Sequence, residues 1–428
     1  HYRQLPTPGL AMNKREFLKT AASVSFGFVL SESLLARMAT ASPAELAEDD
    51  AFWAALRGKY RLKPDYINLE NGYYSMQSQE VLEKFIARVR ELNYQASYYM
   101  RTTLAPDKVA VATRLAAMAG CGADELIITR NTTESLDTVI SGYDWKAGDE
   151  VIMAQQDYGA MRDMFKLSAR RYGIVPVEIS VPMHPANDDE IVQVYANAIT
   201  PKTRLLMCCH MVNITGHILP IRKIAAMAKA RNVDVMVDGA HAFAQLDYRI
   251  SDLGVDYYGA SLHKWLGTPL GAGMLYVRKD KIPSLWPVFA DLGMLDTDIR
   301  KLNHTGTHPA HTDLAINDAI DFHNAIGIQR KEARLRFLQR YWTDKVRDVK
   351  NIELNTPKEI ERSCAIANVG ITNMLPGDMS KALLDKYKVW TVAINSAGVK
   401  GARITPQLFT TTKELDVFVS ALKELAKA

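Results

Sequence analysis

The chain has 428 residues, of which 48% are hydrophobic, so it can bury a sizeable core in two or three domains. Its 52 basic and 48 acidic residues nearly balance and form no basic run with interleaved aromatics, which argues against nucleic-acid binding. Four irregularly spaced cysteines predict neither a disulfide framework nor a metal site. Beyond the N-terminal region, no stretch is long and apolar enough to span a membrane.

The first 42 residues have the pattern of a signal segment. A basic start at residues 13–19 precedes a moderately apolar middle and the small residues Ala39 to Ala41. Residues 14–19 (Lys-Arg-Glu-Phe-Leu-Lys) resemble a twin-arginine export motif with lysine in place of the first arginine. We therefore expect an exported, periplasmic protein. The alternative is an ordinary amphipathic N-terminal helix and a cytoplasmic location.

A strand, a turn and a helix are predicted between residues 125 and 137. The apolar run Leu126 to Thr129 indicates a strand, and a helix is expected to begin near Thr132. Free backbone N–H groups at a helix N-terminus form a natural phosphate seat, to which the hydroxyls of Thr132 and Thr133 would add donors. The alternative is a plain capping box at Thr132 without a ligand.

Asp238 ends a predicted buried strand. Val235 to Val237 form a short apolar run directly before this carboxylate. Ligands of open α/β sheets bind at the carboxyl ends of the strands. Asp238 is therefore a candidate to pair with a protonated pyridine nitrogen, with a helix-capping aspartate as the alternative.

Lys264 lies between a predicted strand and a Gly/Pro-rich turn. Ser261 and His263 precede it, and the apolar run Met274 to Val277 reads as a second buried strand. Partial desolvation favours the free amine, which is the form that makes a Schiff base. A strand-end aspartate followed by Ser-Leu-His-Lys is the order that pyridoxal phosphate (PLP) chemistry needs.

These motifs resemble the class V aminotransferase family of fold-type I PLP enzymes, in its isopenicillin N epimerase-like branch. The resemblance covers nearly everything from Tyr66 onward. It implies an α/β fold with a mostly parallel seven-stranded sheet and a smaller α+β domain. Expected boundaries are a signal segment (1–42), an N-terminal segment packing with the small domain (43–75), a large PLP-binding domain (76–305) and a small C-terminal domain (306–428). One long helix, from about Ala310 to Tyr341, is expected to lead into the C-terminal domain.

The resemblance also implies cofactor contacts. Ser261 and His263 would bind the phosphate, and His241 would contact the ring oxygen or the aspartate. Thr307 matches a loop that reaches the partner subunit's phosphate, which implies a homodimer. Tyr158 would stack on the pyridine ring, and Asn213 would form a hydrogen bond to the cofactor's phenolic oxygen. The full expected set is Thr132, Thr133, Tyr158, Asn213, Asp238, His241, Ser261, His263, Lys264 and Thr307.

Substrate contacts are expected from three further residues. Arg403 lies in a segment similar to the family's Arg-x-Ser/Thr-Pro motif and would grip a substrate carboxylate through two hydrogen bonds. Phe409 replaces that motif's usual tyrosine, so a hydroxyl there is absent. Residues 65–74 are predicted to form a strand followed by an Asn-Gly turn, and such a segment in the family would place Asn71 near the carboxylate. Arg101 would face the site unless it is a surface arginine.

The implied reaction begins with Lys264 removing the α-proton of an amino substrate. Epimerisation, transamination or β-elimination can follow. Epimerisation needs a second acid, for which Tyr158, His210 and Arg101 are candidates. A cysteine desulfurase is disfavoured because residues 391–401, just before Arg403, contain no cysteine.

Two further readings follow from the family. Among exported members of this branch, the nearest analogy is the periplasmic enzyme that modifies the glutamyl group of pyoverdine siderophores. It implies a substrate that presents an amino-acid end on a larger molecule. A non-catalytic binding module is the alternative from a different class, and Lys264 argues against it.

Overall fold

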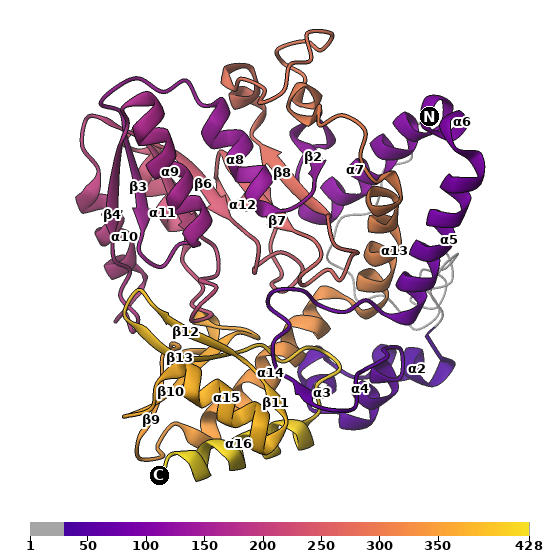
Figure 1. Cartoon of the computed structure of the whole chain (residues 1–428), viewed down its shortest axis with the longest axis vertical. Coiled ribbons are helices and arrows are strands. Elements are labelled where there is room, and N and C mark those ends of the chain that lie inside the picture. Colours follow the sequence, from indigo (N-terminus) through magenta and orange to yellow (C-terminus); the bar gives the residue numbers. More distant parts are fainter. Residues whose placement is uncertain (1–29, 428) are drawn as a thin grey trace.

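A seven-stranded sheet forms the centre of the larger half of the molecule, in a computed structural model that describes residues 30–427 (Figure 1). The strand order is β2-β8-β7-β6-β5-β3-β4. β8 runs antiparallel to both of its neighbours, and the other pairs are parallel. The strands are β2 (Leu126–Thr129), β3 (Glu150–Ala154), β4 (Val175–Ile179), β5 (Thr203–Cys209), β6 (Asp234–Asp238), β7 (Tyr257–Ser261) and β8 (Gly273–Val277).

Helices cover both faces of this sheet because successive side chains of each strand point to opposite faces. In β6, Val235 and Val237 belong to one apolar cluster and Met236 to another. The Met236 side packs on α8 and α9, and the other side packs on α7, α10, α11 and α13. The helices of this half are α5 (Gln79–Gln95), α6 (Ser97–Thr102), α7 (Leu104–Ala119), α8 (Thr132–Gly142), α9 (Gly159–Tyr172), α10 (Asp188–Ala198), α11 (Ile221–Lys229), α12 (Ile250–Leu253) and α13 (Ala310–Ile326).

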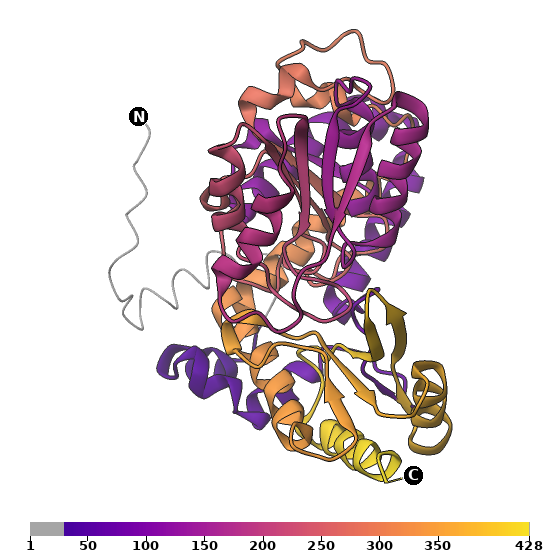
Figure 2. The ribbon, with the colours of Figure 1, turned by 90° about the vertical axis from the view of Figure 1, so that its left-hand side faces the viewer.

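A four-stranded antiparallel sheet in the order β12-β13-β10-β9 lies below the large sheet in Figures 1 and 2. Its helices close over a separate apolar core that includes Trp342 and Phe418, whose rings meet edge to face. The elements are β9 (Ile352–Leu354), β10 (Ala367–Ile371), β11 (Val389–Trp390), β12 (Val392–Ser396), β13 (Val399–Ile404), α14 (Ile328–Val346), α15 (Pro376–Tyr387) and α16 (Thr412–Leu425).

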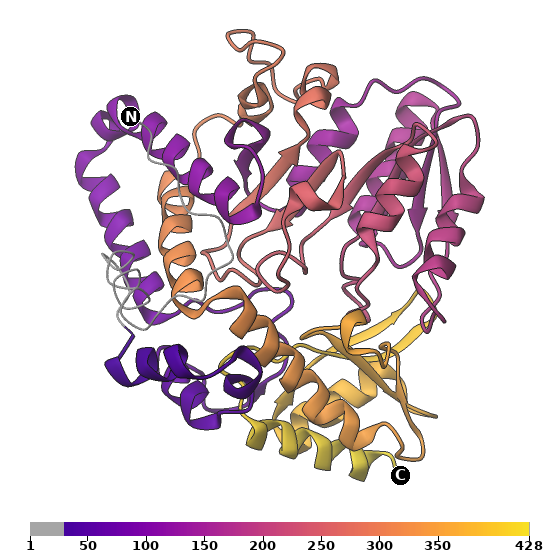
Figure 3. The same cartoon turned by 180° about the vertical axis from the view of Figure 1, so that it is seen from behind.

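One helix was expected from about Ala310 to Tyr341, and that expectation is wrong. The structure divides this stretch at Gly327, whose φ of 86° interrupts the helical backbone. Figure 3 shows the two helices in succession: α13 lies beside α5 of the upper half, and α14 continues into the lower half. The break lets one continuous segment contribute to both cores.

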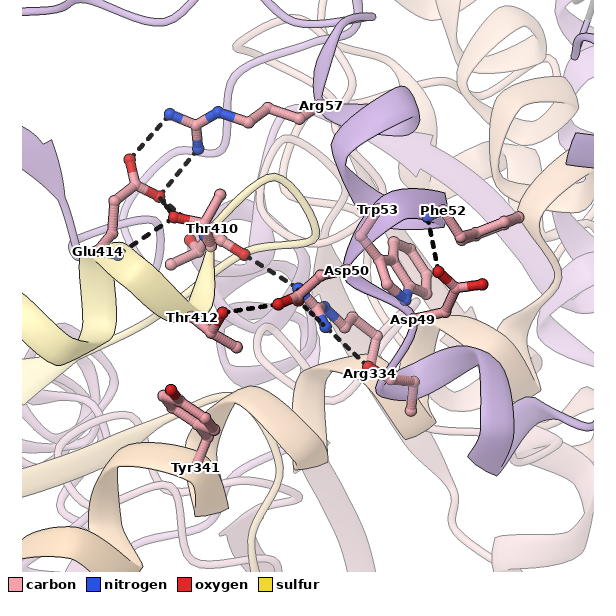
Figure 4. Close-up of polar contacts among 12 residues, drawn as sticks. Asp49, Asp50, Phe52, Trp53, Arg57, Arg334, Tyr341, Thr410, Thr412 and Glu414 are labelled. Carbon is pink, nitrogen blue, oxygen red and sulfur yellow. Dashed lines mark hydrogen bonds and ion pairs between the residues drawn. The ribbon is translucent and has the colours of Figure 1, made fainter.

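The N-terminal segment packs against the lower half. It contains α2 (Glu32–Thr40), α3 (Pro43–Ala47), α4 (Asp50–Arg57) and the short strand β1 (Ile67–Asn68), which pairs in parallel with β11. Figure 4 shows two arginines at this junction. Arg57 forms a two-pronged ion pair with Glu414, and the buried Arg334 donates to the Ala47 carbonyl at 2.7 Å and to Asp50 at 3.3 Å.

We expect Arg334→Ala to lower the free energy of unfolding by about 1–3 kcal/mol, because the substitution removes the donor to the buried Ala47 carbonyl. Urea denaturation measures this loss. Arg340→Ala on the same helix is the matched control, because Arg340 is exposed and its ion pair with Asp344, at 3.6 Å, lies on the surface. The control should change stability by no more than about 0.5 kcal/mol, and an equal loss in both variants would contradict the role of Arg334.

Part of the sequence reading falls outside the described residues. The twin-arginine-like motif at residues 14–19 is among these, whereas Ala39 and Ala41 lie at the end of α2. Between residues 30 and 427, no helix has both the length and the apolar composition needed to cross a bilayer. The domain boundaries placed at residues 42, 75 and 305 remain predictions.

Candidate active site

A cavity of about 320 Å³ lies where the carboxyl ends of the parallel strands meet the small domain. The segments that follow β2, β3, β5, β6 and β7 line it from above, and Gly72 and Arg403 line it from the other side. This is the position at which open α/β sheets bind ligands. Of the predicted site residues, it brings together Thr132, Thr133, Tyr158, Asn213, Asp238, His241, Ser261, His263, Lys264 and Arg403.

Lys264 projects from the turn after β7 and lies 3.0 Å from His241, measured from Nζ to Nε2. Burial lowers the pKa of Lys264 to about 8, and the Asp238 carboxylate opposes part of that shift. Trp265 Nε1 donates to His241 Nδ1 at 3.4 Å. Because an indole only donates, His241 carries its own proton on Nε2 and directs it at Lys264. That arrangement suits a neutral lysine amine.

This pKa predicts how the protein captures an aldehyde. Only the free amine attacks, so the rate at which cofactor-free protein takes up PLP should rise with pH and level off above about 8. Stopped-flow absorbance over a pH series measures that rate. A rate that keeps rising towards 10.5, the ordinary lysine pKa, would contradict the effect of burial.

Asp238 is buried at the end of β6 and faces the same cavity. One carboxylate oxygen accepts a hydrogen bond from the Ala240 N–H at 2.9 Å. Burial raises the pKa of Asp238, and the positive charge of Lys264 opposes the rise. A buried carboxylate of this kind is stabilised by a cationic partner, which a protonated ring nitrogen would supply.

The N-terminus of α8 provides anion-binding groups beside β7. The Thr132 backbone N–H donates to Ser261 Oγ at 2.9 Å, and the two hydroxyls lie 2.7 Å apart. The helix cap is Asn131, whose side chain accepts from the Glu134 N–H, so a capping box at Thr132 is wrong. His263 is a neutral imidazole here, because burial lowers its pKa to about 4. Hydroxyls, backbone N–H groups and an imidazole therefore meet at one end of the cavity.

The expected aromatic and amide groups line the cavity at its sides. Tyr158 precedes α9 and is 45% exposed, so its ring is available to a flat ligand. Asn213 follows β5, and its backbone carbonyl accepts a hydrogen bond from Arg403 Nη1 at 3.3 Å. Asn213 thus links the expected cofactor side of the cavity to the expected substrate side.

Four other predicted residues lie away from the cavity lining. Asn71 is fully buried, and its side chain donates to the Thr405 carbonyl at 2.8 Å, while its neighbour Gly72 reaches the cavity. His210 is buried, and its Nδ1 lies 3.2 Å from the Tyr258 hydroxyl. Arg101 and Thr307 are both exposed.

The sequence reading missed two residues of this site. Glu70 forms a buried ion pair with Arg403, and Trp265 fixes the tautomer of His241. Glu70 is adjacent to the Asn-Gly turn already singled out, so a charged residue at a predicted strand end was the available signal. Trp265 directly follows Lys264 and looked like an ordinary core residue, which by its burial it also is.

The donor set fits PLP. An amine, a buried carboxylate and an anion-binding helix N-terminus face one cavity, matching the aldehyde, ring nitrogen and phosphate of that molecule. Asp238 ends β6, and Lys264 lies in the turn directly after the adjacent parallel strand β7, so the sheet sets their spacing. No group of three or more His, Cys, Asp or Glu residues in the described part of the chain could hold a metal ion.

Known proteins resemble this chain over most of its length. The family model "Aminotransferase class-V" matches residues 75–414. Isopenicillin N epimerase of Amycolatopsis lactamdurans is 28% identical over 88% of this chain and 99% of the relative, and that of Streptomyces clavuligerus is 26% identical over 88% and 98%. A solved structure of a C-DES mutant, with glycine covalently linked to its PLP cofactor, has a TM-score of 0.76 at 20% identity and covers 84% of this chain and 97% of its own.

The family model spans most of the chain, and the structural likeness independently supports the fold-type I architecture predicted from the sequence. The motifs on which the resemblance depended, at Asp238 and at Ser261 to Lys264, lie within the matched residues. The chain therefore belongs to the class V aminotransferase family.

Proposed function

We propose that this protein is a PLP-dependent enzyme that acts on the α-amino carbon of an amino acid, or of the amino-acid end of a larger molecule, in the manner of an aminotransferase or epimerase. One observation carries the proposal: the amine of the half-buried Lys264 faces a cavity that also contains Asp238 and Arg403. An amine, a carboxylate and a guanidinium are the groups needed for the aldehyde, the ring nitrogen and the substrate carboxylate.

The residues would divide the work as follows. Lys264 holds the cofactor's aldehyde, Asp238 its ring nitrogen, and the α8 N-terminus with Ser261 its phosphate. PLP, when bound, supplies an electron sink for the pair left on the α-carbon. Arg403 would orient the substrate carboxylate, and Lys264 Nζ, freed when the substrate's amino group takes its place on the aldehyde, would then accept the α-proton. Burial keeps much of this amine neutral near pH 8, which is the state required of a base.

β-Elimination is the alternative reaction, because it uses the same base and the same carboxylate contact and differs only in what leaves the substrate. A binding module without catalysis is less favoured, since such a module has no need for a lysine whose pKa is lowered to about 8.

Absorption spectroscopy tests the proposal. The purified protein, supplied with PLP, should turn yellow and be bleached by borohydride. Titration with a panel of amino acids, glutamate included, then separates the reactions. Full conversion to the pyridoxamine form, reversed by a keto acid, identifies an aminotransferase; consumption or inversion of the amino acid with recovery of the original band identifies a lyase or an epimerase. A colourless protein that cannot be loaded would overturn the proposal.

A cysteine desulfurase remains disfavoured. Cys364 is fully buried just before β10 and does not line the cavity. Burial raises the pKa of Cys364 to about 12, so its thiol is not an available nucleophile. We expect the protein to form no sulfane sulfur from cysteine. The substitution Cys364→Ala should change the rate of any α-carbon reaction by no more than about twofold. It should lower the free energy of unfolding by about 1 kcal/mol, because it leaves a small cavity. Sulfane sulfur formation that Cys364→Ala abolishes would contradict this.

We also propose a homodimer in which the Thr307 loop reaches the partner's site. Support comes from a run of exposed apolar side chains between β8 and that loop, which is the kind of surface that association covers. Light scattering in solution tests the oligomeric state. The run comprises Trp286, Val288, Phe289, Leu292 and Leu295.

Export is proposed on the sequence pattern of residues 13–41 alone. Fractionation of cells that produce the full chain, with the protein followed by immunoblot, tests it. Recovery only with the cytoplasmic fraction would refute export and leave the proposed chemistry untouched.

A further inference from the structure

Arg403 and Glu70 form a buried ion pair in the wall of the cavity. Arg403 Nε donates to Glu70 Oε2 at 3.1 Å, and Nη2 donates to Oε1 at 2.5 Å. Their side chains are only 9% and 4% exposed. Oε1 also accepts the Tyr73 N–H at 3.0 Å, so three donors hold the carboxylate of Glu70 in place.

The geometry fixes which edge of the guanidinium remains for a ligand. A guanidinium offers a side edge, Nε with Nη2, and an end edge, Nη1 with Nη2. Glu70 occupies the side edge, and Nη1 is anchored to the Asn213 carbonyl at 3.3 Å. A Cβ added at Gly72 would lie 3.2 Å from Arg403 Cζ, so the plane of the group rests directly on a glycine. Nη1 and Nη2 each carry two N–H groups, so each keeps one N–H for a ligand after these bonds are made, and a carboxylate in the cavity therefore meets the end edge.

The ion pair between Arg403 and Glu70 also reduces the net charge of this cavity wall. Glu70 compensates Arg403, so an anion that approaches the end edge is attracted by one partner and repelled by the other. Both interactions are strengthened by burial, since screening is weak in a site shielded from water. A bare carboxylate should consequently bind weakly.

We propose that Glu70 is a positioning and specificity-determining residue that confines carboxylates to the end edge of Arg403 and weakens the site's hold on simple anions. Tight binding then requires the amino group of the substrate as well as its carboxylate, which selects α-amino acids over other organic acids. This inference rests on the proposed function, in which Arg403 is the carboxylate site.

Calorimetry with propionate, a carboxylate without an amino group, tests the charge argument. The variant Glu70→Gln preserves the side-chain shape and one acceptor but removes the charge. Loss of the repulsion outweighs loss of one hydrogen bond, so we expect propionate to bind at least about tenfold more tightly. Glu70→Asp, which keeps the charge, should bind propionate as the parent protein does. The control is Asp65→Asn, because Asp65 is exposed and pairs with Lys63 on the surface.

Unchanged or weaker propionate binding in folded Glu70→Gln protein would overturn the proposal. Should that variant not fold, the parent protein still decides the matter by NMR of selectively ¹⁵N-labelled arginine. The Nε–H signal of Arg403, identified by its loss in Arg403→Lys, should stay unchanged when propionate is added, because Glu70 holds that edge. A shift of this signal would mean that the ligand displaces Glu70.

These measurements are made on protein with and without PLP. A failure of the proposal for Glu70 can therefore be distinguished from a failure of the proposed function. Absence of colour and of borohydride bleaching counts against PLP chemistry. Equal propionate binding in Arg403→Lys and the parent protein counts against Arg403 as the carboxylate site, and with it against the proposal for Glu70.

Discussion

Lys264→Ala should lose all covalent attachment of PLP, and any reaction at the α-carbon should slow by about 10²–10⁴-fold. The substitution removes the amine that bonds the aldehyde and the base that accepts the α-proton, and a positioned base accounts for rate factors of this size. Peptide mass spectrometry after borohydride treatment measures the attachment, and the rate with the amino acid chosen from the spectral panel measures the chemistry.

Lys279→Ala is the control for this variant. Lys279 follows β8, is exposed and pairs with Asp124 on the surface, so its loss should leave labelling and rate unchanged. Covalent labelling that persists in Lys264→Ala would place the attachment on another lysine. The buried Lys331 of α14 would then be examined first.

Asp238→Asn has the second largest expected effect, a loss of about 10²–10³ in rate with covalent attachment retained. The amide has nearly the shape of the carboxylate, but it carries no charge to keep the ring nitrogen protonated. Removing one such electrostatic contact at a reacting centre costs rate factors of this order. Steady-state rates measure the loss, and the spectrum of the borohydride-reduced protein verifies attachment.

Asp234→Asn is the matched control, since Asp234 begins the same strand, β6, at its far end and binds Lys281 at 2.6 Å. The control should keep the full rate. If Asp238→Asn were equally active, the carboxylate would have no electronic role, and the site would need another partner for the ring nitrogen.

Local patterns in the sequence were enough to locate the strand-end and helix-start residues of the cavity, and the resemblance to the family supplied the other predicted lining residues. Asp238, which was predicted to end a buried strand, is the last residue of β6. The helix predicted to start near Thr132 is α8, which begins at that residue. These features depend on neighbouring residues alone. The carboxyl ends of parallel strands lie at the same edge of a sheet. Predicting each strand end therefore also predicted that Asp238 and Lys264 would face the same cavity.

Contacts between distant segments were beyond such patterns. Glu70 meets Arg403, and Asn71 meets Thr405, only after the N-terminal segment packs on the C-terminal domain. Asn71 was predicted to lie near the substrate carboxylate. In the structure its side chain donates to the Thr405 carbonyl, and Gly72 lines the cavity instead. The break at Gly327 was missed because helical periodicity continues on both sides of it.

The position of β2 at the edge of the large sheet has a consequence for synthesis of the chain. Among the residues that the structure describes, its only neighbour in that sheet is β8, and β2 leads into the helix whose N-terminus would seat the phosphate. Pairing of segments so far apart in sequence is slow, because the intervening chain must first be ordered. On the ribosome β2 emerges long before β8, so this phosphate seat is completed only after Val277 has left the exit tunnel. Capture of PLP during translation would therefore wait for β8.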